Sequence, residues 1–539
     1  MKDNSLAKNR STEDTDHPSI TQSLNHSITR SSNHSITQSF ASLTEAIGVP
    51  PQPGWESIEI TGISEDSRLV HPGFLFVAIV GFITDGHRYI EDAIARGAVA
   101  IVGEKDVPCS VPFVRVDNGR EALAHLSAVF FSHPTRDLFT VGVTGTNGKT
   151  TVCHLVAHLL GEERSTLIST VANEARNMRA VTTPTSPLIQ RIAHETLAAE
   201  KENLVLEVSS AALLLHRVDS VDFDVAVFTN LTHDHLDFHD DREGYLAAKL
   251  LLFRNLDPGA TAIVNADDPA ADRVLAASAG HLLTYNCLGS DLVFCMKSSA
   301  TPPLETARPR KKQGLTPSIR AEEISYTPRK TSFTLRVGEE TQPIELHLPG
   351  EHNVYNALAA AAVATVKGMT LTMIAERLRT ARSVEGRYQF FHAKNGATVI
   401  VDFAHSPDSL ERMLLSLHPY HNKIICVFGC GGESDRKKRP LMGAISGTLA
   451  DMTILTSDNP KTEDPEAISA EIEAGLLPTG GRHEKIVDRR DAIRRAIDLA
   501  EPKDVILIAG KGHEPYQIIG HEFVPYSDAG FLHEAGLIS

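Results

Sequence analysis

Short apolar runs alternate with segments of helical spacing over most of the chain. The runs at 139–143, 204–208, 225–229 and 262–264 have the length of buried strands, and helical stretches separate them. Such alternation is typical of an α/β fold with a largely parallel sheet. A second series follows nearer the C-terminus, with strands expected at 398–402, 424–428, 452–456 and 505–509.

The same pattern predicts where the domains lie. The first residues include few large apolar side chains and repeat Ser-Ile-Thr at positions 19, 27 and 35, which is typical of a disordered tail. A Pro-rich, locally basic stretch at 297–320 indicates a flexible surface insertion. The predicted division is a low-complexity tail at 1–46, a small α/β domain at 47–135 with a helix at 88–96, a central domain at 136–380 and a C-terminal α/β domain at 381–539.

Composition narrows the class of protein. With 42% hydrophobic and 22% charged residues among 539, the chain has the make-up of a soluble protein of about three domains. A formal net charge of −16 argues against nucleic acid or an anionic membrane as a partner. The six cysteines are scattered, and neither a pair of Cys-x-x-Cys units nor an apolar run of about 20 residues occurs. We therefore expect a reduced, cytoplasmic protein without a zinc site or stable membrane insertion. We also expect a monomer, which composition does not test.

The segment from Val141 to Thr151 carries the clearest chemistry. An apolar run enters it, glycines follow at 142, 145 and 148, and a helical stretch continues from Val152 to Leu160. Glycines let the backbone approach a polyphosphate, and the free N–H groups of a helix N-terminus bind the anion. Lys149 would reach the β/γ-phosphates of a nucleoside triphosphate, and Thr150 would ligate Mg²⁺. The alternative is a plain glycine turn between a strand and a helix.

The spacing departs from the common phosphate loop, because the residue five before Gly148 is Val143 and not glycine. Thr-Gly-Thr-Asn-Gly-Lys-Thr-Thr at 144–151 resembles the nucleotide loop of the Mur ligases, which form amide bonds using ATP. Folylpolyglutamate synthases and cyanophycin synthetases carry close variants, so the loop alone indicates a superfamily.

Three motifs in the N-terminal part resemble the UDP-sugar domain of MurE-type ligases. They are Asp66-Ser-Arg68, Pro72-Gly-x-Leu-Phe-Val-Ala78 and Asp85-Gly-His87, in this order. The resemblance extends over 47–539. It implies the three-domain Mur ligase architecture: a small α/β UDP-sugar domain, a central P-loop ATPase domain with a mostly parallel sheet, and a C-terminal Rossmann-like domain.

The resemblance also implies roles in phosphate chemistry. Lys149, Glu207, His235 and Lys249 would be catalytic, and Thr150, Glu207 and His235 would ligate Mg²⁺. Lys249 would be carbamylated to N6-carboxylysine, which turns a cation into a carboxylate-like ligand. Taken alone, Glu207 would be a surface carboxylate at a strand end, and Lys249 a solvated helix lysine. The residues implied to contact ATP are Gly145, Thr146, Asn147, Gly148, Lys149, Thr150, Thr151, Asn353, Arg387 and Asp402.

The polar residues expected to bind the UDP-sugar peptide are Ser67, Thr182, Thr183, Ser209 and Arg217. Here the chain departs from the family pattern. The family usually has Glu after Thr-Thr-Pro, where this chain has Thr185. It usually has Ser-Ser-His followed by Gln, where this chain has Ala211 and Leu215. These replacements remove polar groups from the region expected to hold the substrate carboxylate, and bear on affinity more than on reaction type.

The segment Asp458-Asn459-Pro460-Lys461 resembles the family loop that selects the incoming amino acid, and Gly510 and Glu514 belong to the same site. Diaminopimelate-adding members usually have Arg at the fourth position of this loop. Lys461 keeps the positive charge but loses the bidentate fork. A second family arginine aligns with Ser434, and Arg436 is a candidate substitute. Glu514 would bind the ammonium group of the acceptor. Asn-Pro and Gly-Lys-Gly are also common turn sequences.

The resemblance implies an ATP-dependent amide ligase of peptidoglycan synthesis. It would add a third amino acid to UDP-MurNAc-L-Ala-D-Glu through an acyl phosphate, and Lys461 favours meso-diaminopimelate as that amino acid. The same reaction with L-lysine or another diamino acid is one alternative. A different amide ligase, such as a folylpolyglutamate synthase, fits the N-terminal motifs less well. The last alternative is a degenerate homologue that binds nucleotide or UDP-sugar without turnover.

Overall fold

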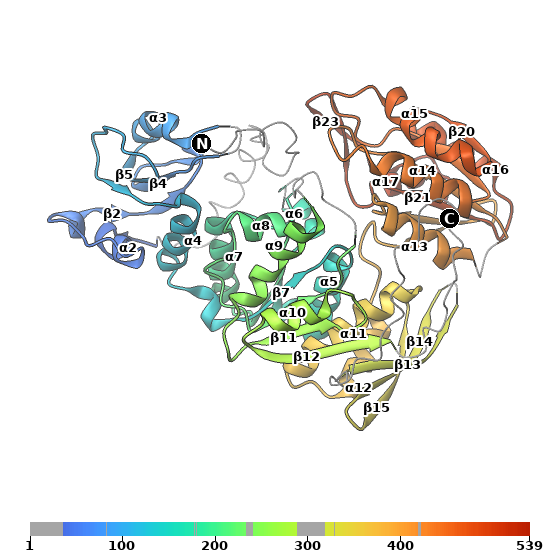
Figure 1. Cartoon of the computed structure of the whole chain (residues 1–539), viewed down its shortest axis with the longest axis horizontal. Coiled ribbons are helices and arrows are strands. Elements are labelled where there is room, and N and C mark those ends of the chain that lie inside the picture. The colour runs from blue at the N-terminus through green and yellow to red at the C-terminus, as the bar shows by residue number, and fades with distance from the viewer. Residues whose placement is uncertain are drawn as a thin grey trace.

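The computed structural model describes residues 36–81, 84–176, 178, 181–232, 241–287, 319–327, 329–418 and 422–538. Three parts follow one another along the chain. Figure 1 shows the first part in blue and the last in orange and red, on either side of a central part in green and yellow. Each part is built around its own main sheet.

The central sheet has nine strands among the described residues, in the order β15-β14-β13-β12-β11-β10-β7-β9-β8. The strands from β8 to β13 are parallel, and β14 and β15 add an antiparallel edge. This arrangement confirms the predicted α/β class. The strands are β7 (Phe139–Thr144), β8 (Ser165–Ile168), β9 (Asn203–Glu207), β10 (Val225–Phe228), β11 (Thr261–Asn265), β12 (His281–Cys287), β13 (Ile319–Tyr326), β14 (Thr331–Val337) and β15 (Glu340–Leu346).

Helices bury both faces of the central sheet, which explains why its strands are apolar throughout. Successive side chains of a strand point to opposite faces. In β10, Val225 and Val227 therefore belong to one core, and Ala226 and Phe228 to the other. The first core includes α5 (Lys149–Leu160), α11 (Glu351–Val366) and α12 (Leu371–Thr380), and the second includes α7 (Ser186–Ala198), α9 (Arg242–Arg254) and α10 (Ala271–Ala277).

The C-terminal part has a six-stranded sheet among the described residues, in the order β16-β17-β21-β18-β19-β20. Only the β16–β17 pair is antiparallel, so the strands from β17 to β20 end at one edge. The strands are β16 (Gln389–His392), β17 (Thr398–Asp402), β18 (Ile424–Phe428), β19 (Met452–Leu455), β20 (His483–Lys485) and β21 (Val505–Ala509). The helices are α13 (Pro407–Leu417), α14 (Lys438–Leu449), α15 (Pro465–Leu476), α16 (Arg489–Leu499) and α17 (Asp528–Glu534).

The N-terminal part has a parallel four-stranded sheet, β3-β4-β5-β6. The helix expected at 88–96 is split into a 3₁₀ turn at Gly86–Tyr89 and α3 (Ile90–Ala95). The remaining elements are β3 (Gly62–Ser64), β4 (Phe74–Ala78), β5 (Ala98–Gly103), β6 (Phe113–Arg115) and α4 (Gly119–Phe130).

The prediction that the low-complexity tail extends to residue 46 is wrong for its last residues. β1 (Gln38–Ser39) pairs with β2 (Glu59–Ile60), and α2 (Phe40–Ala46) follows directly. Phe40 is fully buried, with its ring centroid 4.8 Å from that of Trp55. The helix is stable because its apolar face packs on residues later in the chain, which local composition does not reveal. Residues 1–35 lie outside the described residues.

The predicted insertion at 297–320 is also too long at its C-terminal end. β13 begins at Ile319, which pairs with Tyr285 of β12 and Val337 of β14 and is fully buried. Burial between two strands explains why this end of the segment is ordered. The rest of the predicted insertion, 297–318, lies outside the described residues.

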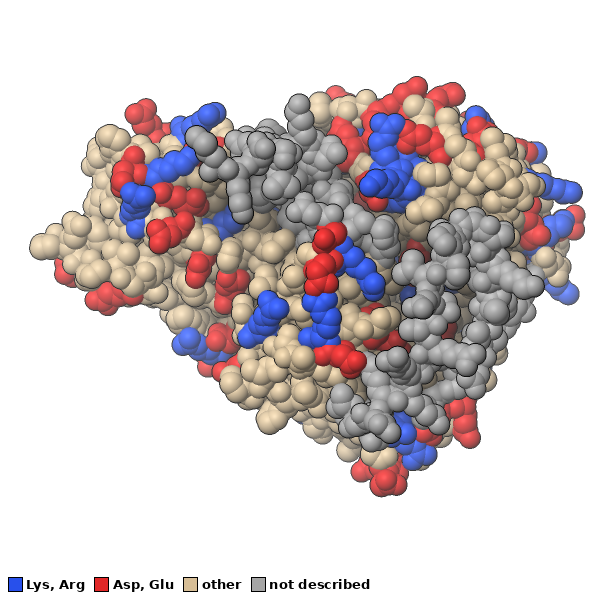
Figure 2. All heavy atoms as spheres, viewed as in Figure 1, with Lys and Arg blue, Asp and Glu red and all other residues tan. Residues whose placement is uncertain are grey.

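The surface carries charges of both signs. Figure 2 shows acidic and basic side chains interspersed over all three parts of one face. In the described residues, no helix combines the length and the apolar character that crossing a membrane requires.

Candidate active site

The predicted strand, glycine loop and helix are confirmed. β7 ends at Thr144, the loop follows, and α5 begins at Lys149. β9 and β10 flank β7 in parallel, so the loop and Glu207 share the carboxyl edge of the sheet, where ligands bind in open α/β folds. The segment after β10 holds the loop: the Thr146 N–H donates to the Asn230 carbonyl (2.8 Å), and the Thr229 hydroxyl donates to the Asn147 carbonyl (2.6 Å).

Two positions in the loop require glycine. Gly145 has φ +148°, and a Cβ atom there would lie 1.9 Å from Thr229 Oγ1. Gly148 has φ +87° and caps α5, and a Cβ atom there would lie 2.5 Å from Asn356 Oδ1. The loop therefore lies tightly against its neighbours and leaves the N–H groups of the first turn of α5 for an anion.

Two lysine ammonium groups lie against the loop backbone. Lys149 Nζ donates to the carbonyls of Gly145 (3.1 Å) and Thr146 (2.9 Å). Lys249 Nζ, from α9, donates to the same Gly145 carbonyl (2.9 Å) and lies 4.3 Å from the centroid of the Tyr245 ring. Lys249 is only 1% exposed, so it is not a solvated helix lysine. The structure thus brings two lysine side chains to the predicted phosphate site.

Glu207 ends β9 and is buried, so it is not a surface carboxylate. It faces α6 (Thr170–Ala175): the Thr170 N–H donates to Glu207 Oε1 (3.0 Å), and the Thr170 hydroxyl donates to Oε2 (3.4 Å). Together with the Thr150 hydroxyl at the start of α5, this carboxylate supplies oxygen donors, which suit Mg²⁺. His235 lies outside the described residues. Within the described ranges, no three or more His, Cys, Asp or Glu side chains form a potential metal cluster.

Asn353 is connected to the loop through a second residue, Asn356. The side-chain amide of Asn353 donates to the Pro349 carbonyl (2.8 Å), and its Oδ1 accepts from Asn356 Nδ2 (3.2 Å). Asn356 is the residue that faces Gly148. The structure therefore places Asn356 directly on the loop and Asn353 in support of it.

Arg387 and Asp402 reach the site from the C-terminal part. Arg387 Nη2 donates to Thr150 Oγ1 (3.4 Å), and the guanidinium lies 4.3 Å from the centroid of the Phe403 ring. Burial lowers the pKa of Arg387, and its Nε is buried without a hydrogen-bond partner among the described residues. Asp402 accepts from the backbone N–H groups of Tyr388 (2.7 Å) and Ala404 (2.8 Å), and burial raises the pKa of this carboxyl.

Four of the five residues predicted to bind the UDP substrate lie beside Glu207. Thr183 donates to the Glu207 carbonyl (2.9 Å) and accepts from the Ser209 N–H (3.1 Å). Arg217 Nη1 donates to the Thr183 carbonyl (2.9 Å), and the Thr170 hydroxyl donates to Thr182 (3.4 Å). The fifth residue, Ser67, lies in the N-terminal part, where it hydrogen-bonds to Asp92 and lowers the pKa of that carboxyl.

Sequence reasoning missed Glu65, which links the N-terminal part, where Ser67 lies, to the four residues beside Glu207. Its carboxylate accepts a hydrogen bond from the Thr185 side chain and lies near Arg217 and Arg191. Burial raises the pKa of Glu65. The N-terminal part thus brings an acidic group to Thr185. The available signal was an acidic residue directly before the Asp66-Ser-Arg68 motif.

The loops predicted to bind the amino acid meet at the carboxyl edge of the C-terminal sheet. Asn459 Nδ2 donates to Glu514 Oε2 (2.9 Å), and the Gly432 N–H donates to the Asn459 carbonyl (2.9 Å). Gly510 has φ +109°, and a Cβ atom there would lie 2.4 Å from Asp458 Oδ2. Pro460 packs as closely on Gly432, where a Cβ atom would lie 1.9 Å from the Pro460 carbonyl oxygen.

Lys461 is held through its backbone by the hairpin of β22 (Tyr516–Ile519) and β23 (Glu522–Pro525). It has φ +51°, its N–H donates to the Ile518 carbonyl (3.0 Å), and its carbonyl accepts from the Gly520 N–H (2.8 Å). A second hairpin contact reaches the central part, because the Tyr516 hydroxyl donates to Glu174 Oε1 of α6 (3.0 Å). The hairpin therefore links the predicted amino-acid loop at 458–465 (the acceptor loop) to the central part.

The phosphate loop also contacts the C-terminal part directly. Asn147 Nδ2 donates to Asp408 Oδ2 of α13 (2.9 Å). With the contacts of Arg387 and Tyr516, this hydrogen bond brings the phosphate loop and the acceptor loops to the same boundary between the two parts. A phosphate group and an acceptor could therefore be held together there.

Comparisons with known proteins agree with this arrangement. Three family descriptions match: "Mur ligase family, catalytic domain" at 59–131, "Mur ligase middle domain" at 143–364 and "Mur ligase, glutamate ligase domain" at 386–512. A protein of Geobacillus thermodenitrificans named UDP-N-acetylmuramoyl-L-alanyl-D-glutamate--2,6-diaminopimelate ligase is 40% identical over 482 residues, or 87% of this chain and 93% of that protein. The chain belongs to the Mur ligase family.

Further relatives are similar over almost their whole length. A protein of the same name from Caldanaerobacter subterraneus subsp. tengcongensis is 38% identical, covering 89% of this chain and 95% of that protein. A solved structure with this ligase name is 29% identical, with a TM-score of 0.63, and covers 93% of this Mur ligase and 98% of that chain. A structure titled as MurF ligase from Thermotoga maritima in complex with ADP shares the fold, with a TM-score of 0.57 at 19% identity over 84% of this chain and 94% of that one.

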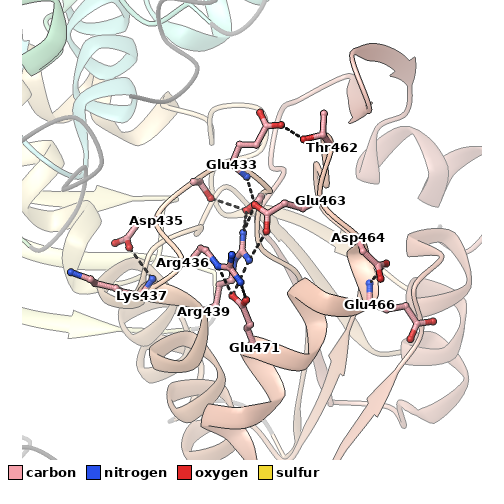
Figure 3. A network of polar contacts seen from close by, with 12 residues as sticks. Glu433, Asp435, Arg436, Lys437, Arg439, Thr462, Glu463, Asp464, Glu466 and Glu471 are labelled. Carbon is pink, nitrogen blue, oxygen red and sulfur yellow. Dashed lines mark hydrogen bonds and ion pairs between the residues drawn. The ribbon is translucent and has the colours of Figure 1, made fainter. Parts of the chain in front are cut away.

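Ser434 stands where the resemblance predicts a second family arginine, and the structure shows what surrounds it. The Ser434 hydroxyl donates to the Gly431 carbonyl (2.7 Å). Arg436, the candidate substitute, is ion-paired with Glu471 of α15, and its side chain is 67% exposed. Figure 3 shows Arg436 and Glu471 in a network that also includes Thr462, Glu463 and Asp464 of the 458–465 loop.

The centre of this network is Arg439, which sequence reasoning missed. Its side chain has no exposed surface, and it donates to Glu463 and Glu471 (2.9 Å each) and to the Gly431 carbonyl (3.1 Å) (Figure 3). Glu463 belongs to the acceptor loop and also accepts from the Glu433 N–H. The buried arginine therefore joins the loops after β18 and β19 to α15. Its signal in the sequence was the basic run Lys437-Lys438-Arg439 after the glycines.

Proposed function

We propose that this Mur ligase uses ATP to join meso-diaminopimelate to UDP-MurNAc-L-Ala-D-Glu in peptidoglycan synthesis. The observation that carries the proposal is the boundary where the phosphate loop, with Lys149 and Lys249, meets the C-terminal loops that present Lys461 and Glu514. The names of the relatives at 38% and 40% identity support the same reaction.

The reaction begins with transfer of the γ-phosphoryl group of ATP to the side-chain carboxylate of D-glutamate. Lys149 and the N–H groups at the start of α5 hold the transferring phosphate and stabilise its negative charge. Thr150, Glu207 and His235, with Lys249 as N6-carboxylysine, would hold Mg²⁺, which when bound would neutralise charge on the β/γ-phosphates. Asn353, Arg387 and Asp402 orient the nucleotide from both sides of the boundary. The amine of the acceptor then attacks the acyl phosphate, and phosphate leaves as the amide forms.

The UDP substrate is held by Ser67, Thr182, Thr183, Ser209 and Arg217, with Glu65 near Thr185. Asp458, Asn459, Pro460 and Gly510 shape the acceptor site, Glu514 binds an ammonium group and Lys461 binds a carboxylate. meso-Diaminopimelate differs from L-lysine by a carboxylate at the far end, so the charge of Lys461 favours diaminopimelate. L-Lysine is the second candidate, because Lys461 and Ser434 both lack the guanidinium fork that grips a carboxylate through two hydrogen bonds.

The test uses the purified protein with ATP, Mg²⁺ and UDP-MurNAc-L-Ala-D-Glu, supplied in turn with meso-diaminopimelate, L-lysine and no amino acid. Phosphate release and the mass of the UDP-linked product are measured together. We expect release and a tripeptide product with diaminopimelate. A tripeptide product with L-lysine alone would show that L-lysine is the acceptor. No phosphate release with either amino acid, from folded protein that binds ATP, would refute the ligase function.

A further inference from the structure

One buried lysine in the acceptor site has no role in the chemistry described so far. Lys511 lies between Gly510 and Glu514 on the loop after β21, and none of its surface is exposed. Burying an ammonium group is costly unless charged and polar partners compensate for lost water. Lys511 Nζ donates to Glu514 Oε2 (2.9 Å) and to Asn459 Oδ1 (2.9 Å). Both partners belong to the predicted acceptor site.

These contacts leave the two oxygens of Glu514 in different environments. Oε2 accepts from Lys511 Nζ and from Asn459 Nδ2, both at 2.9 Å. No other hydrogen bond to this carboxylate occurs among the described residues, and 19% of the Glu514 side chain remains exposed. Oε2 is therefore held by two donors of the protein, and Oε1 is available to a ligand.

The surroundings of Glu514 shift the pKa of its carboxyl in opposite directions. Burial raises the pKa of the Glu514 carboxyl, Lys511 lowers it, and Asp458 raises it. Arg387 and His513 are further titratable groups near Glu514, and the centroid of the Tyr516 ring lies 5.9 Å from Lys511 Nζ. A carboxyl with a raised pKa is a poor partner for an ammonium ion, because it is neutral below that pKa. Lys511 is the closest cation that keeps this carboxyl ionised.

We propose that Lys511 is a positioning residue for the acceptor: with Asn459 it holds Glu514 through Oε2, keeps the carboxylate charged, and leaves Oε1 to receive the ammonium group of the incoming diamino acid. The inference rests on the proposed function, because it gives Glu514 its acceptor role. Lys511 itself does not touch the reacting atoms.

The test compares Lys511→Met with the full-length wild type and with Lys423→Met, which removes an exposed lysine at the opposite edge of the same sheet. Phosphate release is measured against diaminopimelate concentration from pH 6 to pH 9. We expect the KM for diaminopimelate to rise roughly 30-fold in Lys511→Met, with the KM for ATP and for the UDP substrate within about twofold of wild type. Lys423→Met is expected to match the wild type.

The pH profile separates positioning from a merely structural role. Without Lys511 the pKa of Glu514 rises further, so the acid limb of kcat/KM for diaminopimelate is expected at higher pH in Lys511→Met. Glu514→Gln removes the titrating group, and adding Lys511→Met to it is expected to cost less than threefold more, because the lysine acts through the glutamate. An unmoved acid limb, or full additivity of the two substitutions, overturns the inference. A wild type that releases no phosphate with any diamino acid overturns the proposed function, and this inference with it.

Discussion

The phosphate loop and the acceptor loops of this Mur ligase are built in different ways. The phosphate loop is fixed by its backbone: glycines at 145 and 148 lie against Thr229 and Asn356, and Lys149 and Lys249 donate to backbone carbonyls. The acceptor loops are fixed by charged side chains. There Lys511 bridges Asn459 and Glu514, and Arg439 bridges Glu463 and Glu471.

The two constructions differ in how much change of sequence they tolerate. A backbone cradle fails when a single Cβ atom is added, so its sequence has little freedom. A site made of side-chain charges can exchange one cation for another and keep its overall field. Lys461 in place of an expected arginine is such an exchange. Ser434 in place of the second expected arginine removes a cation, and Arg436 and Arg439 remain in the surrounding network. We infer that the phosphate loop determines the reaction and the acceptor loops determine the amino acid.

The largest effect is expected from Lys149→Ala. Removing this ammonium group takes a charge-stabilising donor from the transferring phosphate, and kcat for phosphate release should fall about 1,000-fold. Lys367→Ala, which removes an exposed lysine of the central part, is the control and should stay near wild type. Activity retained in Lys149→Ala would place phosphate transfer somewhere other than this loop.

Gly145→Ala tests whether the cradle depends on its backbone. The added Cβ would lie 1.9 Å from Thr229 Oγ1, so the loop must shift. We expect kcat/KM for ATP to fall about 30-fold, with diaminopimelate KM nearly unchanged. Gly338→Ala is the matched control, because Gly338 also has positive φ (+58°) but nothing within 4 Å of its Cβ position. An equal loss of ATP turnover in both variants would show that general destabilisation, and not close approach in the phosphate loop, is the cause.

Lys461→Ala tests the acceptor loop. Losing the charge should raise the KM for diaminopimelate about 10-fold and leave the KM for ATP unchanged. Lys461→Arg, which restores the fork, should hold or lower the diaminopimelate KM. A direct comparison with L-lysine completes the experiment: an equal loss for both amino acids would show that Lys461 does not recognise the distinguishing carboxylate.

The smallest effect is expected when the pH is lowered, and the loss of unfolding free energy should be similar for one buried histidine in each region. Burial lowers the pKa of His154, on α5, to about 4 and that of His513, beside Glu514, to about 3. Both stay neutral when folded but gain protons near pH 6.5 when unfolded. The stability gained by keeping both histidines neutral in the folded protein is therefore fully present above pH 6.5. It is lost as the pH falls towards 4 for His154 and towards 3 for His513. Each should cost roughly 2 kcal/mol of unfolding free energy between pH 7 and pH 5.

Urea unfolding at pH 7 and pH 5 measures this loss. His154→Gln and His513→Gln should each reduce the difference between the two pH values by a similar amount. A variant with the full wild-type pH response would show that its histidine is already protonated in the folded protein.

The sequence predicts the two regions unequally well. The strand, loop and helix around Lys149 follow from local spacing, and the strands 398–402, 424–428 and 505–509 match the structure residue for residue. Glu65 and Arg439 could not be assigned a role, because their partners lie on other segments of the chain; Lys511 has Glu514 three residues away, but its second partner, Asn459, is 52 residues distant. The same limit explains the error at α2, whose Phe40 packs on Trp55 from the following segment.

The central claim is that ATP activates the D-glutamate carboxylate at the boundary between the two regions. It is tested most directly by labelling that carboxylate of UDP-MurNAc-L-Ala-D-Glu with oxygen-18 and analysing the phosphate released with diaminopimelate by mass spectrometry. An acyl phosphate route transfers one labelled oxygen to each phosphate, and the amide keeps the other. Phosphate without the label, released while the tripeptide product forms, would contradict the account.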